Sequence, residues 1–196
     1  MKAIQEDRMR GYFLNAAKDL IRAEGIQVVS ARNVAERAGY SYATLYNYFK
    51  DIRDLIFSCI EDFMKECNDF VNNNTKNSKP GQDRLKQSVN NYAKFFLQYP
   101  GIFVLLYQQT PTDMSTKDSN VGSIYGFFDT LIEDDWKIVY EQSSHANKEL
   151  LFIKENFKYS IHGLLLFYLN RRKDMEFKDF NNEVAAITEL FISMSA

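Results

Sequence analysis

Proline and glycine are scarce in this sequence of 196 residues, which holds only 3 prolines and 8 glycines. Few residues therefore interrupt its regular elements, and this scarcity favours long helices. Sustained alternation of apolar and polar residues, the mark of a half-buried strand, is missing, as are the Asn-Gly and Asp-Gly pairs of tight hairpins. These absences argue against a β-sheet protein and predict an all-α fold.

Cysteine is also scarce, and long apolar runs are absent. Cys59 and Cys67 lie eight residues apart on one expected helix, about 12 Å along its axis, which is beyond the reach of a disulfide. The longest apolar runs, 101–107 and 163–169, are far shorter than the ~20 residues of a membrane span. The first residues contain no apolar signal core. We therefore expect a soluble, cytoplasmic protein with reduced thiols and no membrane partner.

Net charge is small but unevenly distributed. The whole chain carries a formal charge of −2. Residues 1–55 hold nine basic and seven acidic side chains, whereas the rest of the chain holds 15 basic and 19 acidic ones. The total charge gives no sign of a polyanionic partner, but the mild asymmetry places the positive end of the chain in its N-terminal part.

Residues that could carry catalysis are few. His145 and His162 are the only histidines, and neither has the spacing to cysteines or carboxylates that forms a zinc site. No phosphate-binding glycine loop or dinucleotide fingerprint occurs. The consecutive carboxylates Glu133, Asp134 and Asp135 point in different directions on a helix, so we expect a solvated surface there. The sequence predicts no enzyme, no metal and no cofactor, and we interpret His162 as a satisfied, buried histidine.

Helical periodicity predicts the order of the elements. Phe13, Ala17, Leu20 and Ile21 share one apolar face of a first helix. A long helix begins at Asp51 and runs to about Val71, and the polar stretch 72–83, with its Pro-Gly pair, is the clearest linker. Further helices are expected at 82–99, 101–109, 121–143, 147–172 and 177–194, with a loop at 111–120.

Two short helices around Gly39 form a candidate helix-turn-helix. Ser30 precedes the segment ARNVAERA, and Ser41 precedes YATLYNYF, so each serine can cap the helix that follows it. Gly39 stands where the turn requires a positive φ, which glycine adopts at little cost. Leu45 and Phe49 are placed on the core side of the second helix.

The outer face of that second helix has an unusual composition. With Leu45 and Phe49 inward, the helical period turns the following residues outward or to the flanks: Ala43, Asn47, Lys50, Tyr42, Tyr46, Thr44 and Tyr48. Hydroxyls and a lysine suit contact with phosphates, and short side chains suit contact with base edges in the major groove of DNA. Spacing alone fits equally well a pair of helices that only pack against the rest of the protein.

The run from Phe13 to Ile56 resembles the N-terminal DNA-binding region of TetR-type transcriptional regulators. The shared features are the pair Ala16-Ala17, Gly25, Ser30, the NVA-x-x-AG run at 33–39, the S-x-x-TLY-x-YF signature at 41–49, and Leu55. The resemblance implies that residues 1–52 form a three-helix DNA-binding domain with its motif at 30–49. It implies that residues 53–196 form a larger helical domain for ligand binding and dimerisation.

The resemblance also implies roles for single residues. The expected DNA-binding residues are Arg32, Ser41, Tyr42, Ala43, Thr44, Tyr46, Asn47, Tyr48 and Lys50. Among them Tyr42 and Ala43 match base-reading positions, and Lys50 matches a position that grips the backbone. Two residues depart from the family pattern. Tyr40 replaces a branched aliphatic residue, and Ile52 replaces a common lysine, which removes one phosphate anchor unless Arg53 supplies it.

The family further implies a homodimer that reads a palindromic operator in double-stranded DNA, most often a repressor released by a small effector. Nineteen aromatic residues follow residue 80, and they suggest an apolar or aromatic effector. Its expected contacts are Phe96, Tyr99, Phe103, Tyr107, Tyr125, Phe128, Trp136 and Phe157. The expected dimer interface contains Ile161, Leu164, Leu165, Tyr168, Val184, Ile187 and Phe191.

Two alternatives stay open at this point. The apolar stripes near the C-terminus can equally be the core of a single chain. The alternative function is that of a protein-interaction or ligand-binding protein of the same fold that has lost specific DNA binding. Two observations support it: Ile52 removes a phosphate anchor, and the positive charge is modest.

Overall fold

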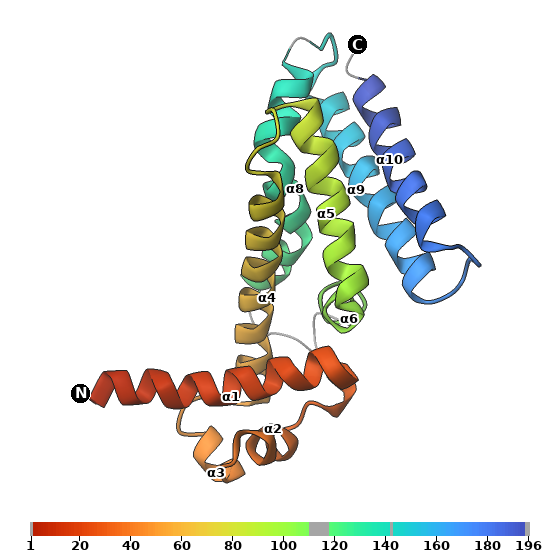
Figure 1. Cartoon of the computed structure of the whole chain (residues 1–196). Coiled ribbons are helices and arrows are strands. Elements are labelled where there is room, and N and C mark those ends of the chain that lie inside the picture. Colours follow the sequence, from red (N-terminus) through yellow and green to blue (C-terminus); the bar gives the residue numbers. More distant parts are fainter. Residues whose placement is uncertain (1, 110–117, 142, 195–196) are drawn as a thin grey trace. The chain divides into compact units, whose positions relative to one another are not determined.

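The computed structural model describes residues 2–109, 118–141 and 143–194, and its regular elements there are all helices (Figure 1). In chain order they are α1 (Lys2–Glu24), the short 3-10 helix η1 (Ile26–Val28), α2 (Ala31–Ala38), α3 (Tyr42–Leu45), α4 (Ile52–Thr75), α5 (Gln82–Gln98), α6 (Pro100–Tyr107), α8 (Asp118–Tyr140), α9 (Asn147–Leu169) and α10 (Phe177–Ser193). No strand occurs in these ranges, which confirms the predicted all-α class. Within them no helix is both long enough and apolar enough to cross a membrane.

The element boundaries differ from the sequence prediction mainly around the polar linker. α4 continues to Thr75, because polar side chains of its last turn bond back to the helix: Asn74 Nδ2 donates to the carbonyl oxygen of Phe70 at 2.7 Å, and Thr75 Oγ1 donates to that of Val71 at 2.9 Å. The expected linker 72–83 therefore shortens to residues 76–81. Of the expected loop 111–120, residues 118–120 begin α8, and the others lie outside the described residues.

The chain divides into two compact units. The first contains residues 1–66 and 99–125, and the second contains residues 67–98 and 126–196. The division passes through α4 and α8, so the first unit is larger than the segment 1–52 expected for DNA binding.

The core of the first unit forms where α1, α2, α3 and α4 turn their apolar faces inward. Phe13, Ile21, Val34, Leu45 and Leu55 are completely buried. α6 approaches α1 so closely that a Cβ atom at Gly101 would overlap the carbonyl oxygen of Ile21. The absence of a side chain at position 101 therefore permits this contact.

Charged side chains fasten α1 to α4 inside the first unit. Lys18 Nζ contacts Asp62 Oδ2 at 2.8 Å and Glu66 Oε1 at 2.7 Å, and Arg22 pairs with Glu66 as well. Burial alone would lower the pKa of Lys18, but the hydrogen bonds to Asp62 and Glu66 outweigh it and raise that pKa above its ordinary value. Lys18 therefore stays charged and holds both acids.

The second unit has an aromatic core built around α5, α8 and α9. Tyr92 packs edge-on against Phe96 and Phe128, with ring centroids 4.9 and 5.0 Å apart, and Phe128 packs against Phe157 at 5.7 Å. Tyr92 also bonds to Nε2 of His162 at 2.8 Å, and Nδ1 of His162 lies 2.7 Å from the carbonyl oxygen of Lys158. Both ring nitrogens therefore have partners, which confirms the expectation of a satisfied histidine.

The acidic run on α8 is only in part the solvated surface that was expected, because Asp134 is exposed but Asp135 is buried. Asp135 is 4% exposed, and its carboxylate accepts from the backbone nitrogen of Gly81 at 2.8 Å and from Nε of Arg84 at 2.7 and 2.9 Å. Glu133 pairs with Lys137 and Lys154, and these hydrogen bonds lower its pKa. The prediction failed for Asp135 and Glu133 because Arg84 of α5 and Lys154 of α9, both distant in sequence, pair with them.

Candidate nucleic-acid interface

The first helix of the motif, α2, begins at a side-chain cap. Ser30 has an extended backbone, and its hydroxyl oxygen accepts from the backbone nitrogen of Asn33 at 3.1 Å. The amide of Asn33 donates in turn to the carbonyl oxygen of Val28 at 2.7 Å. These two bonds fix the entry of the chain into α2 and confirm the cap expected at Ser30.

Gly39 closes α2 in a left-handed conformation. Its φ is 77° and its ψ is 26°, and its backbone nitrogen donates to the carbonyl oxygens of Ala35 and Glu36. A Cβ at this position would have no neighbour within 4 Å. The positive φ, and not lack of space, is therefore the reason for glycine here.

The second helix of the motif is shorter than the expected span 42–49. α3 covers only Tyr42–Leu45, and its N-terminus is capped by Ser41, whose hydroxyl oxygen accepts from the backbone nitrogen of Thr44 at 3.2 Å and lies 2.8 Å from the Thr44 hydroxyl. Tight turns continue the coil, since Tyr48 N and Phe49 N both donate to the carbonyl oxygen of Leu45. We call residues 41–50 the recognition segment.

Burial divides the recognition segment as the helical period predicted. Leu45 is fully buried and Phe49 is 1% exposed. The candidate contacts Arg32, Ser41, Tyr42, Ala43, Tyr46, Asn47 and Lys50 are exposed, and Thr44 and Tyr48 are half-buried. The structure thus brings all nine expected DNA-binding residues into the first unit and leaves most of their side chains accessible.

Arg10, which the sequence analysis did not single out, has a structural role. Arg10 of α1 donates from Nη1 to the carbonyl oxygen of Tyr48 at 3.0 Å and from Nη2 to Oγ of Ser58 at 2.8 Å. Its guanidinium lies 4.2 Å from the centre of the Phe49 ring, in cation–π contact. Arg10 shares a helical face with Phe13 and Ala17, and that spacing was the available signal.

The unusual Tyr40 is accommodated against α1. Its ring stacks on Tyr12 at 6.1 Å between centroids and tilts against Phe13 at 5.6 Å. The turn therefore accepts a bulkier ring than the branched aliphatic residue it replaces. Tyr12 and Tyr40 stay 51% and 40% exposed, so they extend the tyrosine-rich surface of the unit.

The start of α4 adjoins the recognition segment. Asp51 Oδ1 accepts from the backbone nitrogen of Asp54 at 2.9 Å, and Asp54 Oδ2 accepts from that of Lys50 at 3.0 Å. This reciprocal pair caps the helix and fixes the backbone of Lys50. Ile52 is half-buried and Arg53 is exposed, so Arg53 offers a cation directly beside the position of Ile52.

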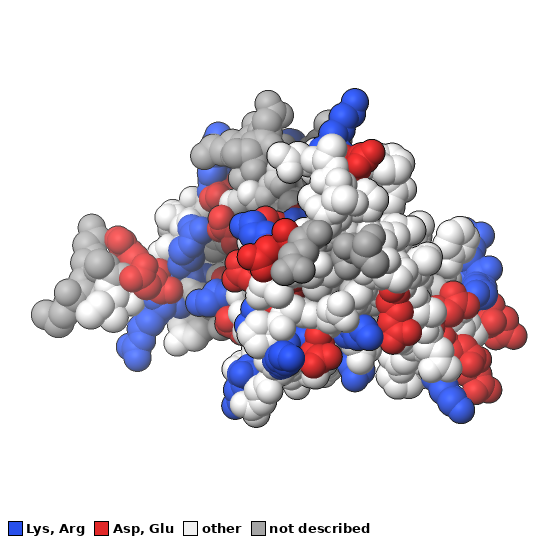
Figure 2. All heavy atoms as spheres, turned by 90° about the horizontal axis from the view of Figure 1, so that it is seen from above, with Lys and Arg blue, Asp and Glu red and all other residues white. Residues whose placement is uncertain are grey.

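The cations of this surface are available for an external anion. Over the described residues, Arg32, Lys50 and Arg53 make no side-chain ion pair within the chain. In the view from above in Figure 2, basic and acidic side chains are mixed with uncharged ones, and no patch of one sign is visible. Unpaired cations beside accessible hydroxyls are the arrangement that phosphate contacts need.

The expected effector contacts fall into both units. Phe96, Phe128, Trp136 and Phe157 are buried in the second unit, where Trp136 stacks on Phe157 at 5.8 Å. Tyr99, Phe103, Tyr107 and Tyr125 belong to the first unit, and Phe103 contacts Tyr107 at 5.2 Å between ring centroids. The buried rings of each unit pack against one another, so much of this aromatic content serves the two cores.

Part of the expected dimer interface is core of the single chain. Ile161, Leu165, Val184 and Phe191 are buried inside the second unit, so a partner chain cannot reach them directly. Leu164, Tyr168 and Ile187 are half-buried. Sequence analysis missed most of the large apolar residues of α9 and α10 that are exposed: Leu151, Phe152, Tyr159, Phe167, Phe177 and Leu190. Periodicity identifies an apolar stripe but does not tell which molecule covers it.

Comparison with known proteins agrees with this geometry. The sequence model described as bacterial regulatory proteins, tetR family, matches residues 13–59, which include the whole helix-turn-helix. An uncharacterized HTH-type transcriptional regulator of Haemophilus influenzae is 23% identical over 135 residues. That match spans 68% of this chain and 66%, just under two thirds, of the Haemophilus protein.

Solved structures share the fold over nearly the whole chain. A TetR-family transcriptional regulator from Streptomyces coelicolor superposes with a TM-score of 0.75 at 17% identity, covering 97% of this chain and 82% of its own. A TetR-family regulator from Marinobacter aquaeolei superposes with a TM-score of 0.66 at 18% identity, covering 96% and 97%. At sequence identities this low, structural similarity is evidence for a shared fold alone.

Proposed function

We propose that this chain, a TetR-family transcriptional regulator, acts as a homodimeric repressor that a small effector releases from a palindromic operator. The observation that carries the proposal is the recognition segment: buried Leu45 and Phe49 anchor it, and exposed Tyr42, Tyr46 and Lys50 face outward. A helix-turn-helix of this form places its second helix in the major groove.

The proposed contacts divide by chemistry. The aromatic Tyr42 and the short Ala43 stand at the start of α3. They read base edges, because the N-terminal residues of a recognition helix lie deepest in the groove. Lys50 and the hydroxyl of Tyr46 contact phosphates and fix the register. Arg32, at the start of α2, contacts a base edge or a phosphate from the neighbouring helix.

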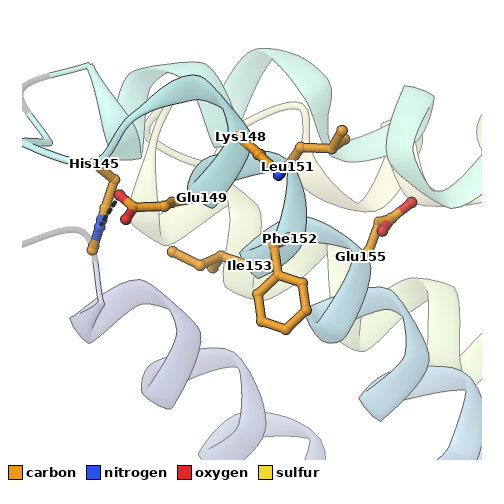
Figure 3. Close-up of a pocket in the computed structure, with 7 residues that line it drawn as sticks. All are labelled: His145, Lys148, Glu149, Leu151, Phe152, Ile153 and Glu155. Carbon is orange, nitrogen blue, oxygen red and sulfur yellow. Dashed lines mark ion pairs between the residues drawn. The ribbon is translucent and has the colours of Figure 1, made fainter.

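The proposed dimer uses the exposed apolar residues of α9 and α10. Phe152, Tyr159 and Leu166 recur at intervals of seven residues, so they lie along one face of α9. Leu151, Phe152 and Ile153 also line an open pocket of about 550 Å³ at the start of α9, beside the ion pair of His145 with Glu149 (Figure 3). Large apolar residues exposed along one helix are typical of surfaces that another protein covers.

The proposed effector is a neutral apolar or aromatic compound, and the proposal rests on the many aromatic residues of the C-terminal part. Such a compound would compete with ring–ring contacts like that between Phe128 and Phe157. By mass action it can release the operator only if it binds better to a form of the dimer that fits DNA poorly.

The test is selection of duplexes from random-sequence DNA at near-physiological salt, with sedimentation to measure the size of the complex. We expect a palindromic consensus bound by two chains. The double variant Tyr46→Ala, Lys50→Ala should fail to enrich it, whereas Lys65→Ala, which removes an exposed lysine from α4, should enrich it normally. A folded protein that enriches no consensus would contradict the proposal.

A further inference from the structure

A small polar cavity lies in the second unit, where the end of α4, the start of α5 and the middle of α8 come together. Its volume is about 180 Å³, and of its nine described lining residues only Leu131 is apolar. Aromatic residues do not line it, so it is separate from the ring clusters to which an effector was assigned above. A ligand of this cavity would therefore be polar.

The floor of the cavity is built from buried polar groups. Thr75, Ser88 and Asp135 line it and are 3%, 4% and 4% exposed. A buried carboxylate is costly unless it is paired, and Asp135 is held by Nε of Arg84 and by the backbone nitrogen of Gly81. These bonds come from the start of α5, so they fix the shape of the floor.

Several polar groups around the floor have hydrogen-bond donors or charges that no described residue of the chain uses. Arg84 uses only Nε to bind Asp135, and its two terminal nitrogens donate to no group in the described part of the chain. The hydroxyl of Ser88 also lacks a partner among the residues that the structure describes. At the rim, Lys76 and Asp134 are exposed and make no ion pair with any described side chain.

The size and charge of the cavity select the ligand. Each liquid water occupies about 30 Å³, so the cavity holds the equivalent of roughly six waters, well below the volume that a drug-sized ligand needs. Asp135 is already paired with Nε of Arg84. The terminal nitrogens of Arg84 and the ammonium of Lys76 can therefore bind the carboxylate of a ligand. The carboxylate of Asp134 can bind an ammonium group, and the Ser88 hydroxyl can donate to the carboxylate of a ligand or accept from its ammonium group.

We propose that this cavity binds a small zwitterion of amino-acid size, with its carboxylate on Arg84 and Lys76 and its ammonium group on Asp134. The proposal does not depend on DNA binding, because all of these groups belong to the second unit. It adds a polar ligand site to a protein whose proposed effector is apolar.

The first experiment is titration of the full-length protein with L-alanine by calorimetry, beside acetate and methylammonium, which each carry half of the charge pattern. We expect saturable binding of L-alanine, and binding at least about tenfold weaker for either half, since each half loses one charged hydrogen-bonding group. Failure of L-alanine to bind, or equal binding of acetate, would overturn the assignment of a zwitterion site.

Matched variants test the location. Lys76→Gln and Asp134→Asn each remove one rim charge and should weaken L-alanine binding about tenfold. Lys79→Gln and Asp83→Asn change exposed residues nearby that do not line the cavity, and binding should stay unchanged. Equal affinities in all four variants would show that L-alanine binds elsewhere. Arg84 is left intact because its loss would strand the buried carboxylate of Asp135.

Discussion

Arg10 donates a hydrogen bond of 3.0 Å to the carbonyl oxygen of Tyr48, across 38 positions of sequence. The same guanidinium bonds to Ser58 in α4 and covers the ring of Phe49. One side chain of α1 thus joins the end of the recognition segment to α4. The orientation of the recognition segment therefore depends on a residue outside the helix-turn-helix.

Substituting Arg10 should weaken the first unit. Arg10→Ala leaves the part-buried carbonyl oxygen of Tyr48 without its donor and removes the bond to Ser58, whose hydroxyl still donates to the carbonyl oxygen of Asp54 at 3.1 Å. We therefore expect about 2 kcal/mol of destabilisation and a lower operator affinity. Chemical denaturation and a DNA-binding titration measure the two effects. Arg8→Ala is the control, because Arg8 is exposed two residues earlier in α1, and its stability should change by less than about 0.5 kcal/mol. Similar losses in the two variants would contradict the structural role of Arg10.

Lys50 should report on the number of recognition segments that engage DNA. Each phosphate contact that is lost reduces the slope of log affinity against log salt by about 1. A homodimer carries two copies of Lys50, so Lys50→Gln should reduce the slope by about 2. Lys65→Gln, a change of the same charge on α4, should leave the slope unaltered. If the salt dependence of Lys50→Gln equals that of the parent protein, Lys50 does not contact a phosphate.

Two glycines in the helices of the first unit should respond in opposite ways to the same change. At Gly101 a methyl group would overlap the carbonyl oxygen of Ile21, so Gly101→Ala forces α6 away from α1 and should destabilise the unit by more than about 1 kcal/mol. At Gly11 no atom lies within 4 Å of the added Cβ, and Gly11→Ala should stabilise by about 0.5–1 kcal/mol through helix propensity. Thermal unfolding measures the stability of both variants. Stabilisation by Gly101→Ala would contradict the close approach of α6 to α1.

Local features of the chain could be predicted from the sequence. The caps at Ser30 and Ser41 and the positive φ of Gly39 depend on residues within a few positions of each other. The inward positions of Leu45 and Phe49 follow from helical periodicity alone. For these reasons the helix-turn-helix was predicted almost completely, apart from the early end of α3.

Long-range features could not be predicted in the same way. The burial of Asp135 depends on Arg84, which lies 51 positions earlier, and the role of Arg10 depends on Tyr48 and Ser58. Ile161 and Leu165 were assigned to a partner chain, but they contact their own. An apolar or charged side chain indicates that it needs a neighbour, whereas the identity of that neighbour depends on the packing of distant helices.

His162 makes the stability of the second unit dependent on pH. A carbonyl oxygen can only accept, so Nδ1 of His162 carries the proton in its bond to Lys158, and Nε2 accepts from the hydroxyl of Tyr92. Burial lowers the pKa of His162 from 6.5 to about 4, and the bond to the carbonyl oxygen of Lys158 opposes this only in part. The folded protein therefore keeps the neutral ring well below neutral pH.

The sign of the effect follows from the two protonation states. Between pH 6.5 and about 4 the unfolded chain binds a proton at His162 that the folded chain does not, so the stabilisation is complete above pH 6.5 and is lost as the pH falls through this window. His162→Gln keeps one donor and one acceptor but does not titrate. Carboxylates titrate in both proteins and cancel in the comparison, so denaturation at pH 7 and pH 4.5 should show a larger loss of stability in the parent protein. Equal losses would mean that the imidazole is protonated in the folded state, and that the bond from Tyr92 to Nε2 is broken as the pH falls.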